Sequence, residues 1–491
     1  MDRSLPRSRA FAGLVALTVL VSCSEKSTEP VARMTPGSAS RATSPAAGRH
    51  LVLAKGNGFS ANFASTVAGL GGSVEAAHQA AGFAVVRGLS ATAAAQLARS
   101  ADVAEVQTDD VVSLHAPVAP VQADASSLAI GTRSVSNPAT ALLVSWQLNM
   151  TSIHADAAWA AGKLGDPGVT VAIIDSGIDY DAVDLNGLVD LSRSVSFSAS
   201  DNQVRSTYFP TRNSISDFNG HGTNVAVQVS SKALAFAGVT SRTTLMGVKV
   251  TGQNGSGDFG DILQGVLWAA DHGADVANMS LGGDFAKAGA GRLTSIINRV
   301  FNYAKQRGML IVVAAGNEAA DIDHNGNVTN GFCDMIHVIC VSAVGAISST
   351  GSADIPAYYT NFGRSAISVA APGGNADAAH GFPASSWPWG SDIASWVWSL
   401  CSKTLIAEFT ETGTPVLTSC VAGNRLSGFI GTSQAAPHVA GLAALLVSVK
   451  GHGQPQVIKH IIEQSADDLG QPGTDPFFGR GRINVKKALG L

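Results

Sequence analysis

The stretch Val171-Ala-Ile-Ile-Asp-Ser-Gly-Ile-Asp179 decides the fold that this sequence predicts. Apolar residues fill Val169–Ile174, and the polar Asp175 follows at once, as expected for a strand buried on both faces. Five further apolar runs follow, with helical patterns between them. The strands are expected at Leu245–Val250, Val276–Ser280, Met309–Ala314, Val338–Val344 and Ile367–Ala371, and the helices at His221–Ser231, Asp258–His272, Leu293–Arg307 and Ser433–Val449. This alternation predicts an α/β fold with a doubly wound, mostly parallel sheet.

Three reactive residues stand where such a sheet places its active site, beyond the carboxyl ends of the strands. Asp175 ends a strand, His221 begins a helix in Gly220-His-Gly-Thr-Asn-Val-Ala226, and Ser433 begins another in Gly431-Thr-Ser-Gln-Ala-Ala-Pro-His-Val-Ala-Gly441. A serine hydroxyl becomes a good nucleophile when a histidine takes its proton and a buried carboxylate orients that histidine. Each residue alone also has a structural reading, as a strand-end acid, a polar residue or a helix cap. The three strings together predict nucleophilic catalysis.

These strings resemble the subtilisin-like serine peptidases, the subtilase family, in which Asp, His and Ser occur in this order. The resemblance covers about Trp146 to Leu491. It implies a three-layer subtilisin-like fold, serine endopeptidase activity on protein or peptide substrates, and chemistry that requires no cofactor. It also implies that Asp175, His221 and Ser433 form the charge relay.

Further residues match the family's site. Asn317 in Ala314-Ala-Gly-Asn-Glu318 matches the oxyanion asparagine, with a turn residue as the alternative reading. Asn278-Met-Ser-Leu-Gly-Gly283 resembles the segment that pairs with substrate backbone, and its alternative is a helix-start turn. The substrate-binding candidates are Ser280, Leu281, Gly282, Gly283, Ala315 and Gly316. Gln434 and Asn224 depart from the family pattern, which often has Met and His at these positions.

The N-terminus reads as an export signal. A basic start precedes Ala10–Ser22, a stretch of apolar and small residues that suits a signal peptide better than a membrane span. Leu20-Val-Ser-Cys23 resembles a bacterial lipoprotein box, which implies a lipid on Cys23 and attachment to the membrane. Ordinary signal cleavage nearby is the alternative. We expect an extracytoplasmic protein, either a cell-envelope lipoprotein or a secreted one.

A small unit precedes the α/β domain. His50–Leu114 has the order β-α-β-β-α-β of ferredoxin-like folds. It resembles the family's inhibitor-type propeptide, which implies self-cleavage followed by inhibition by the released segment. The expected divisions are a signal peptide with lipobox (1–23), a flexible tether (24–48), the propeptide (49–115), a linker with the maturation site (116–145) and the peptidase domain (146–491).

Five cysteines leave one over in an exported protein. If Cys23 carries a lipid, an even set remains. A Cys401–Cys420 bridge closes a loop for which the chain-entropy description gives about 3 kcal/mol, and Cys333 and Cys340 are close enough in sequence for a second bridge. Four free buried thiols are the alternative.

An insertion separates Pro372 from Ser433. It contains Trp387, Trp389, Trp396 and Trp398, which form either an aromatic wall beside the cleft or a small core of their own.

The sequence leaves open whether the protein binds a structural calcium ion. The segment Asp321-Ile-Asp-His-Asn-Gly-Asn327 resembles the first half of an EF-type loop, with Asp321, Asp323 and Asn325 as candidate ligands. Phe332 stands where such a loop has its last glutamate, and a polar surface turn is the alternative. Asp184 aligns with an acidic calcium ligand of some subtilases, although the segment after His221 is short.

Composition excludes other classes. The 491 residues carry 32 Lys and Arg against 36 Asp and Glu, which argues against a nucleic-acid partner. A hydrophobic content of 45% excludes global disorder. We expect the protein to be a monomer. Two rival functions remain: a non-catalytic surface binding protein on a subtilase scaffold, and an esterase. The esterase elbow Gly-x-Ser-x-Gly does not surround Ser433.

Overall fold

The computed structural model describes residues 48–114, 120–125, 128, 130, 137–324, 326–346, 351–375, 395–422 and 425–491. The expected signal peptide with Cys23, and the tether up to residue 47, lie outside the described residues. So do Asn325, Trp387 and Trp389.

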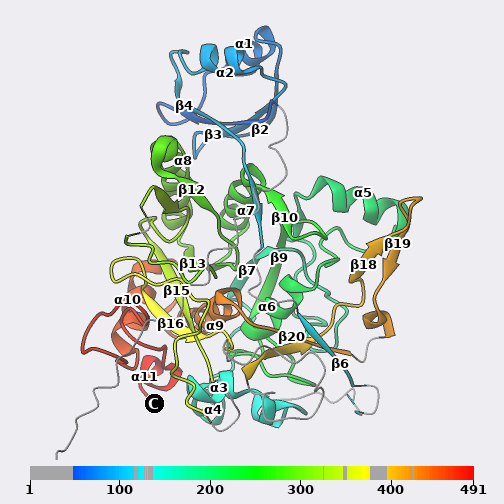
Figure 1. The fold of residues 1–491 in the computed structure, drawn as a ribbon, viewed down its shortest axis with the longest axis vertical. Helices are drawn as coiled ribbons and strands as arrows, with labels where there is room; N and C mark the ends of the chain where they lie inside the picture. The colour runs from blue at the N-terminus through cyan, green and yellow to red at the C-terminus, as the bar shows by residue number, and fades with distance from the viewer. Residues whose placement is uncertain are drawn as a thin grey trace, which may run out of the picture. The chain divides into compact units, whose positions relative to one another are not determined.

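A seven-stranded parallel sheet forms the centre of the larger domain, in the order β16-β15-β13-β11-β7-β9-β8 (Figure 1). Its strands are β7 (Thr170–Asp175), β8 (Val195–Ser196), β9 (Thr244–Lys249), β11 (Val276–Met279), β13 (Leu310–Ala314), β15 (Val338–Val344) and β16 (Val369–Pro372). All six predicted strands are present within two residues of their expected ends. The α/β class with a parallel sheet is therefore confirmed. The two-residue strand β8 was not predicted.

The two faces of the sheet are covered by different helices. Along β7, Val171 and Ile173 join a core that includes residues of α6 (His221–Val229) and α9 (Thr432–Lys450). Their neighbours Ala172 and Ile174 join a second core, with α7 (Phe259–Asp271) and α8 (Lys287–Gln306). The strand has no polar face because both faces are buried, and the result is a three-layer domain.

Further helices of the larger domain, among its described residues, are labelled in Figure 1. They are α3 (Leu148–Ser152), α4 (Ala155–Ala160), α5 (Ala199–Tyr208), α10 (Pro455–Ser465) and α11 (Val485–Leu489). Within the described residues, α9 is the one helix long and apolar enough to cross a bilayer, and 89% of its most apolar window is buried inside the protein.

The N-terminal unit has a four-stranded antiparallel sheet in the order β2-β3-β1-β4. Its elements are β1 (His50–Ala54), α1 (Phe63–Gly69), β2 (Ser73–His78), β3 (Phe83–Arg87), α2 (Ala91–Leu97) and β4 (Val103–Thr108). This is the ferredoxin-like order, and a separate apolar core lies between sheet and helices. Ser90 caps α2 by accepting a hydrogen bond from the Ala93 N–H (3.2 Å).

The structure differs from the sequence expectation just after this unit. Val111–Ser113 was expected to complete it, but these residues form β5, which pairs antiparallel with β10 (Ser256–Asp258) of the larger domain. Val112 is buried in the same core as α7 and α8. An apolar face formed by distant residues therefore decides where this strand lies, and local sequence does not contain that information.

The predicted linker 116–145 also contains structure. Within it, β6 (Val121–Asp124) pairs antiparallel with β20 (Arg425–Phe429), which pairs on its other edge with β17 (Val397–Leu400). Two 3₁₀ turns, Pro138–Thr140 and Val144–Trp146, follow. This Pro- and Ala-rich segment lacks the alternation of apolar and polar residues typical of a strand. Its strand β6 therefore forms because it pairs with β20.

The insertion before Ser433 joins the main fold. Trp396 and Trp398 are buried in the core with α6 and α9. Trp398 packs edge-on against Trp146 at 6.1 Å between ring centroids. For these two tryptophans the prediction of a separate small core is wrong, because they enter the main core. Beyond them β18 (Ile406–Phe409) and β19 (Pro415–Leu417) form a hairpin, followed by the 3₁₀ turn Ser419–Ala422.

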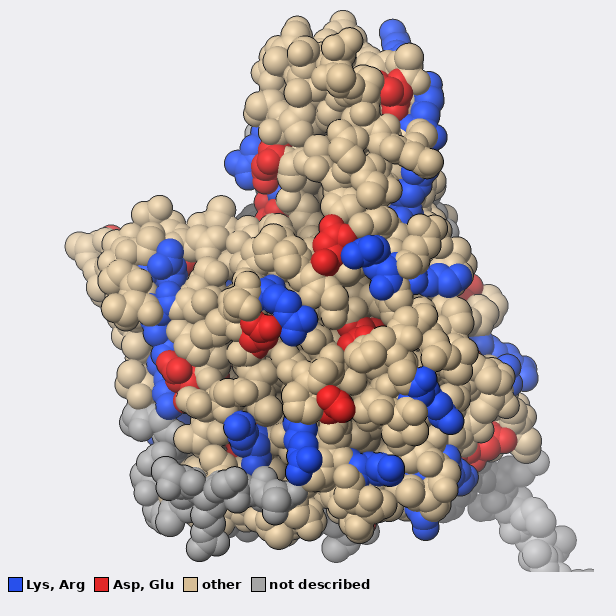
Figure 2. Space-filling view, turned by 180° about the vertical axis from the view of Figure 1, so that it is seen from behind, with Lys and Arg blue, Asp and Glu red and all other residues tan. Residues whose placement is uncertain are grey.

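Charged side chains do not separate by sign on the face shown in Figure 2, where basic and acidic groups are interspersed. This distribution agrees with the nearly balanced composition of 32 basic and 36 acidic residues.

Candidate active site

Asp175 and His221 form a buried pair. Asp175 ends β7, and its Oδ1 lies 2.8 Å from His221 Nδ1. Asp175 is fully buried and His221 is 6% exposed. The glycine after His221 permits this approach, because a Cβ at Gly222 would lie 2.2 Å from the Gly177 carbonyl oxygen and 3.1 Å from Asp175 Oδ1. The string His221-Gly222 is therefore a requirement of the local packing.

The surroundings of His221 favour its charged form. Burial by itself lowers the pKa of the imidazole, but the charge and hydrogen bond of Asp175 and the charge of Asp217 raise it, and the net pKa lies above the ordinary value. An imidazole held in this way can accept a proton and stabilise the resulting cation.

Asp217 is a supporting residue that the sequence analysis missed. Its Oδ1 accepts hydrogen bonds from Gly220 N (2.8 Å) and from Ser176 Oγ (3.0 Å). Its Oδ2 accepts from Thr223 N at 2.9 Å and Thr223 Oγ1 at 2.5 Å. Burial raises the pKa of this carboxyl despite the nearby charge of Lys249 and these donors. Asp217 thus holds the first turn of the helix that begins at His221. An Asp four residues before a predicted helix start is the signal that could have indicated it.

Ser433 lies in the first turn of α9 and is 7% exposed. Its Oγ donates to the Ser280 carbonyl (3.0 Å), and Ser280 Oγ donates to the Ser433 carbonyl (2.6 Å). Gln434 Nε2, next in sequence, donates to Asn224 Oδ1 (3.3 Å), three residues after His221. These bonds bring the starts of α6 and α9 together, so the structure places the predicted histidine and serine on neighbouring helices.

Asn317 lies beside the predicted nucleophile. Its Oδ1 accepts hydrogen bonds from Thr432 N (2.8 Å) and Thr432 Oγ1 (2.9 Å), immediately before Ser433. Thr432 Oγ1 in turn accepts from Gly316 N (3.0 Å). Because the amide oxygen is held in this way, the N–H donor of the amide lies at its opposite end. These bonds fix the orientation of the Asn317 amide next to Ser433.

Two backbone segments border the site. One is Ser280–Gly283, which follows β11, and the other is β10. Val112 of β5 lies between them, because β5 pairs with β10 and a Cβ at Gly283 would lie 3.5 Å from Val112 Cγ2. An extended chain therefore fits beside the predicted substrate-binding glycines, where backbone pairing gives affinity with little demand on sequence.

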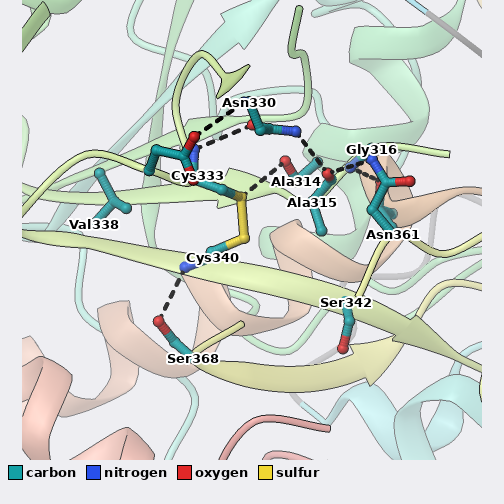
Figure 3. The surroundings of a disulfide bond; sticks show 12 residues. Ala314, Ala315, Gly316, Asn330, Cys333, Val338, Cys340, Ser342, Asn361 and Ser368 are labelled. Carbon is teal, nitrogen blue, oxygen red and sulfur yellow. Dashed lines mark hydrogen bonds between the residues drawn. A yellow bond between two sulfur atoms is a disulfide. The ribbon is translucent and has the colours of Figure 1, made fainter. Parts of the chain in front are cut away.

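Two asparagines and a disulfide surround Ala315 and Gly316 (Figure 3). Asn330 Nδ2 and Asn361 Nδ2 each donate to the Ala315 carbonyl at 3.0 Å. The Cys333–Cys340 disulfide fastens the turn after β14 (Val328–Asn330) to β15 of the sheet. Gly316 has a φ of +101°, and a Cβ there would lie 2.4 Å from Asn361 Nδ2. The segment that leads to Asn317 is therefore fixed by its surroundings.

A second disulfide joins Cys401 to Cys420 across the base of the β18–β19 hairpin. Beside it, Lys403 N donates to Asp179 Oδ2 (2.8 Å), and Ser402 Oγ donates to the Asp217 carbonyl (2.7 Å). The hairpin is therefore attached to the loop that precedes His221.

Two of the candidate calcium ligands, Asp321 and Asp323, lie within the described residues, and both accept hydrogen bonds from the protein. Asp321 Oδ1 accepts from Asp323 N (3.1 Å), and its Oδ2 lies 3.0 Å from His324 Nδ1. Asp323 accepts from Ser365 N at 2.9 Å and from Ser365 Oγ at 2.6 Å. The structure thus gives both carboxylates partners from the protein itself. Among the described residues, no three His, Cys, Asp or Glu side chains gather as a metal site would require.

Asp184 is likewise held by donors of the protein. Its carboxylate accepts the backbone N–H groups of Leu234, Ala235 and Phe236 at 2.8 to 3.1 Å. Burial raises the pKa of Asp184 to about 6, although these donors favour the charged form. The backbone of residues 234–236 thus holds this buried carboxylate.

Comparison with known proteins gives a family. The profile of the subtilase family matches residues 166–481. The chain is 32% identical over 347 residues to the thermophilic serine proteinase of Bacillus sp. strain AK1, which covers 70% of this chain and 67% of that protein. It is 28% identical to thermitase of Thermoactinomyces vulgaris, over 70% of this chain and 95% of thermitase.

Solved structures agree on the fold. The epidermin leader peptide processing serine protease of Staphylococcus aureus superposes with a TM-score of 0.68 at 20% identity, over 90% of this chain and 98% of its own. A lanthipeptide protease superposes with a TM-score of 0.56 at 25% identity, over 71% of this chain and 96% of its own. The first of these likenesses concerns the fold alone.

Proposed function

This chain belongs to the subtilase family of serine peptidases, and from that premise we propose that Asp175, His221 and Ser433 hydrolyse peptide bonds through an acyl-enzyme. The observation that carries the proposal is the buried Asp175–His221 pair at 2.8 Å, at the start of the helix next to Ser433. The neighbouring proteins are named as proteinases, which agrees with this chemistry.

In the proposed mechanism, the Ser433 hydroxyl turns from the Ser280 carbonyl toward His221 and attacks the substrate carbonyl. His221 takes the proton and later gives it to the leaving amine, and Asp175 stabilises the imidazolium. The Asn317 amide and the Ser433 N–H hold the oxyanion. One side-chain donor of this kind lowers the barrier by about 3 kcal/mol in subtilisin. Water then releases the acyl group.

The nucleophile is tested with a fluorophosphonate probe and casein hydrolysis. Ser433→Ala should abolish both labelling and turnover, whereas Ser448→Ala, on the same helix but bonded only to the Leu445 carbonyl, should retain both. Labelling that persists in Ser433→Ala would refute the assignment. A wild type that neither reacts with the probe nor hydrolyses casein would favour the alternative, a non-catalytic binding protein. A preference for simple esters over peptides would favour an esterase.

We also propose that residues 49–115 are an inhibitor-type propeptide that the enzyme removes itself. The ferredoxin-like order of the unit and the pairing of β5 along β10 support this. The test compares the N-terminus of purified wild-type protein with that of Ser433→Ala. Wild type should begin within the predicted linker 116–145, while Ser433→Ala keeps the N-terminal unit.

Export with a lipid on Cys23 completes the proposal, and it rests on the sequence of residues 1–23. Subtilase relatives such as the minor extracellular protease of Bacillus subtilis carry an extracellular location in their names. Labelling cells with a fatty acid tests the anchor. Wild type should carry the label in the membrane fraction, and Cys23→Ala should lose it.

A further inference from the structure

Two short strands, β5 and β6, pair with strands near the proposed catalytic centre. β5 lies along β10, and Leu114 N, just after β5, donates to the Gly255 carbonyl (2.8 Å). β6 lies along β20, with Val121 opposite Gly428. Leu114 and Val121 are seven residues apart (121 − 114), so the chain between them spans at most about 25 Å.

The end of the first strand lies close to His221. A Cβ at Gly255 would lie 3.5 Å from Leu114 Cβ and 3.6 Å from Asn219 Nδ2. Asn219 Oδ1 accepts a hydrogen bond from the His221 N–H (3.3 Å). Leu114 and Asn219 therefore both lie beside Gly255, so Leu114 is close to the loop that precedes His221.

The start of the second strand lies close to both His221 and Ser433. Val121 faces Gly428, and the next residue of β20, Phe429, places its ring edge-on to the His221 ring at 5.9 Å between centroids. Ser433 follows four residues after Phe429 (433 − 429). Leu114 and Val121, the described residues at the two ends of this connection, therefore both lie near His221.

β20 is the strand with which β6 pairs. β17 occupies one edge of β20 and β6 the other. Without β6, this second edge would present unpaired N–H and C=O groups, which bind an extended chain well. Gly428 permits the approach, because a Cβ there would lie 3.0 Å from both Val121 Cγ2 and the Trp398 ring.

We propose that this edge of β20 binds extended polypeptide on the leaving-group side of the scissile bond, and that β6 is its first occupant. The proposal rests on the peptidase function given above. It places the self-cleavage between Leu114 and Val121, and it gives the enzyme a substrate contact several residues beyond the cut.

The packing of β6 defines the segment that this edge accepts. Ala123 is 7% exposed and faces the main core, and Ala125 just after the strand is fully buried there. Gln122 and Asp124 are exposed. A side chain larger than alanine at the inward positions would have to displace core atoms. The preferred partner is therefore an extended segment with small apolar residues at alternate positions.

The first test is the intact mass of the self-processed protein. We expect a new N-terminus between residues 115 and 121, and a start elsewhere would overturn the proposal. A peptide p-nitroanilide, which has no residues after the scissile bond, separates the two levels. If wild type does not hydrolyse it, the proposed function fails. If wild type hydrolyses it but begins elsewhere, only this inference fails.

The second test changes β6 in the full-length precursor. Ala123→Glu directs a charge into the core-facing position, and Gln122→Glu is the matched change on the exposed side. Because burying a charge is costly, Ala123→Glu should slow self-cleavage by about tenfold or more, and Gln122→Glu should stay within about twofold. Turnover of the p-nitroanilide by the processed variants shows that each has folded. Equal processing rates in the two variants would overturn the proposal.

The third test supplies the strand in trans. In processed Ala123→Glu, where β6 no longer competes, we compare peptide substrates that end three or ten residues after the scissile bond. The long peptide carries alanine at alternate positions, and a version with glutamate there is the control. The long alanine peptide should have a KM about fivefold lower than the other two, equivalent to about 1 kcal/mol. Equal KM values would refute the role of β20.

Discussion

Raising the pH should release the N-terminal unit from the peptidase domain, because of a cluster around Arg49. The Arg49 guanidinium is 1% exposed and lies 2.5 to 2.9 Å from four carboxylates. Glu75 and Asp109 belong to the N-terminal unit, while Asp258 and Asp261 lie at the start of α7. One positive charge faces four negative ones, so the buried contact favours the uptake of protons.

The direction of the pH effect follows from the two buried carboxyls. Burial raises the pKa of Asp109 to about 7 and that of Asp261 to about 6, although Arg49 opposes the shift. After separation both return toward the ordinary 3.8. The docked state then binds more protons than the separated state, so docking is strongest near pH 4 and weakens as the pH rises through 7. Glu75 keeps Arg87 and Arg49 of its own unit as partners and changes little on release.

The size of the effect can be bounded. A shift from 3.8 to about 7 at Asp109 corresponds to at most about a thousandfold loss of affinity between pH 4 and pH 8. The assay is size-exclusion chromatography of the self-cleaved protein at pH 5, 6, 7 and 8, scored by how much N-terminal fragment elutes with the peptidase.

A matched pair of variants isolates the cause. Asp109→Asn imitates the protonated form and should keep the fragment bound at pH 8. Asp102→Asn, whose carboxylate accepts only from Ser60 within the N-terminal unit, should behave as wild type. Association that is unchanged or stronger as the pH rises from 5 to 8 would refute this reasoning.

Three further predictions concern the catalytic domain. The acid limb of the pH profile of kcat/KM should lie above pH 6.5, because the pKa of His221 is raised. Asp217→Asn should shift this limb to lower pH when peptide hydrolysis is measured across the pH range, and an unshifted limb would contradict the role of the Asp217 charge. Replacing Cys333 and Cys340 with Ser together should lower the free energy of unfolding by about 2 kcal/mol in urea, and an unchanged midpoint would contradict it. Adding EDTA should move the melting temperature by less than about 2 °C, and a larger fall that calcium reverses would reveal a metal site.

The sheet and the proposed site could be predicted because their signals are local. The strand Thr170–Asp175 is apolar from Val171 to Ile174, just before its final carboxylate, and the histidine and serine lie in long glycine-rich strings. The close approach at Gly222 explains one glycine of such a string, because any larger residue there would clash with the neighbouring backbone. The glycine in the sequence therefore already indicates a close approach.

Other features depend on partners far away in the sequence. β6 is a strand because β20 lies beside it, about 300 residues later, and nothing in Val-Gln-Ala-Asp indicates this. The three N–H groups on Asp184 come from residues 50 to 52 positions away. Alignment with calcium-binding relatives suggests a ligand at this position, whereas the folded backbone gives the same carboxylate a different partner.

The burial of α9 ties stability to activity. Sixteen consecutive residues, Thr432 to Val447, are buried in this helix, and the second of them is the proposed nucleophile. A substitution anywhere along its length that shifts the helix axis also shifts the serine relative to His221 and Asn317. Substitutions intended to change the stability of the enzyme should therefore avoid this helix. They should be made at the surface, where a gain in stability need not reduce turnover.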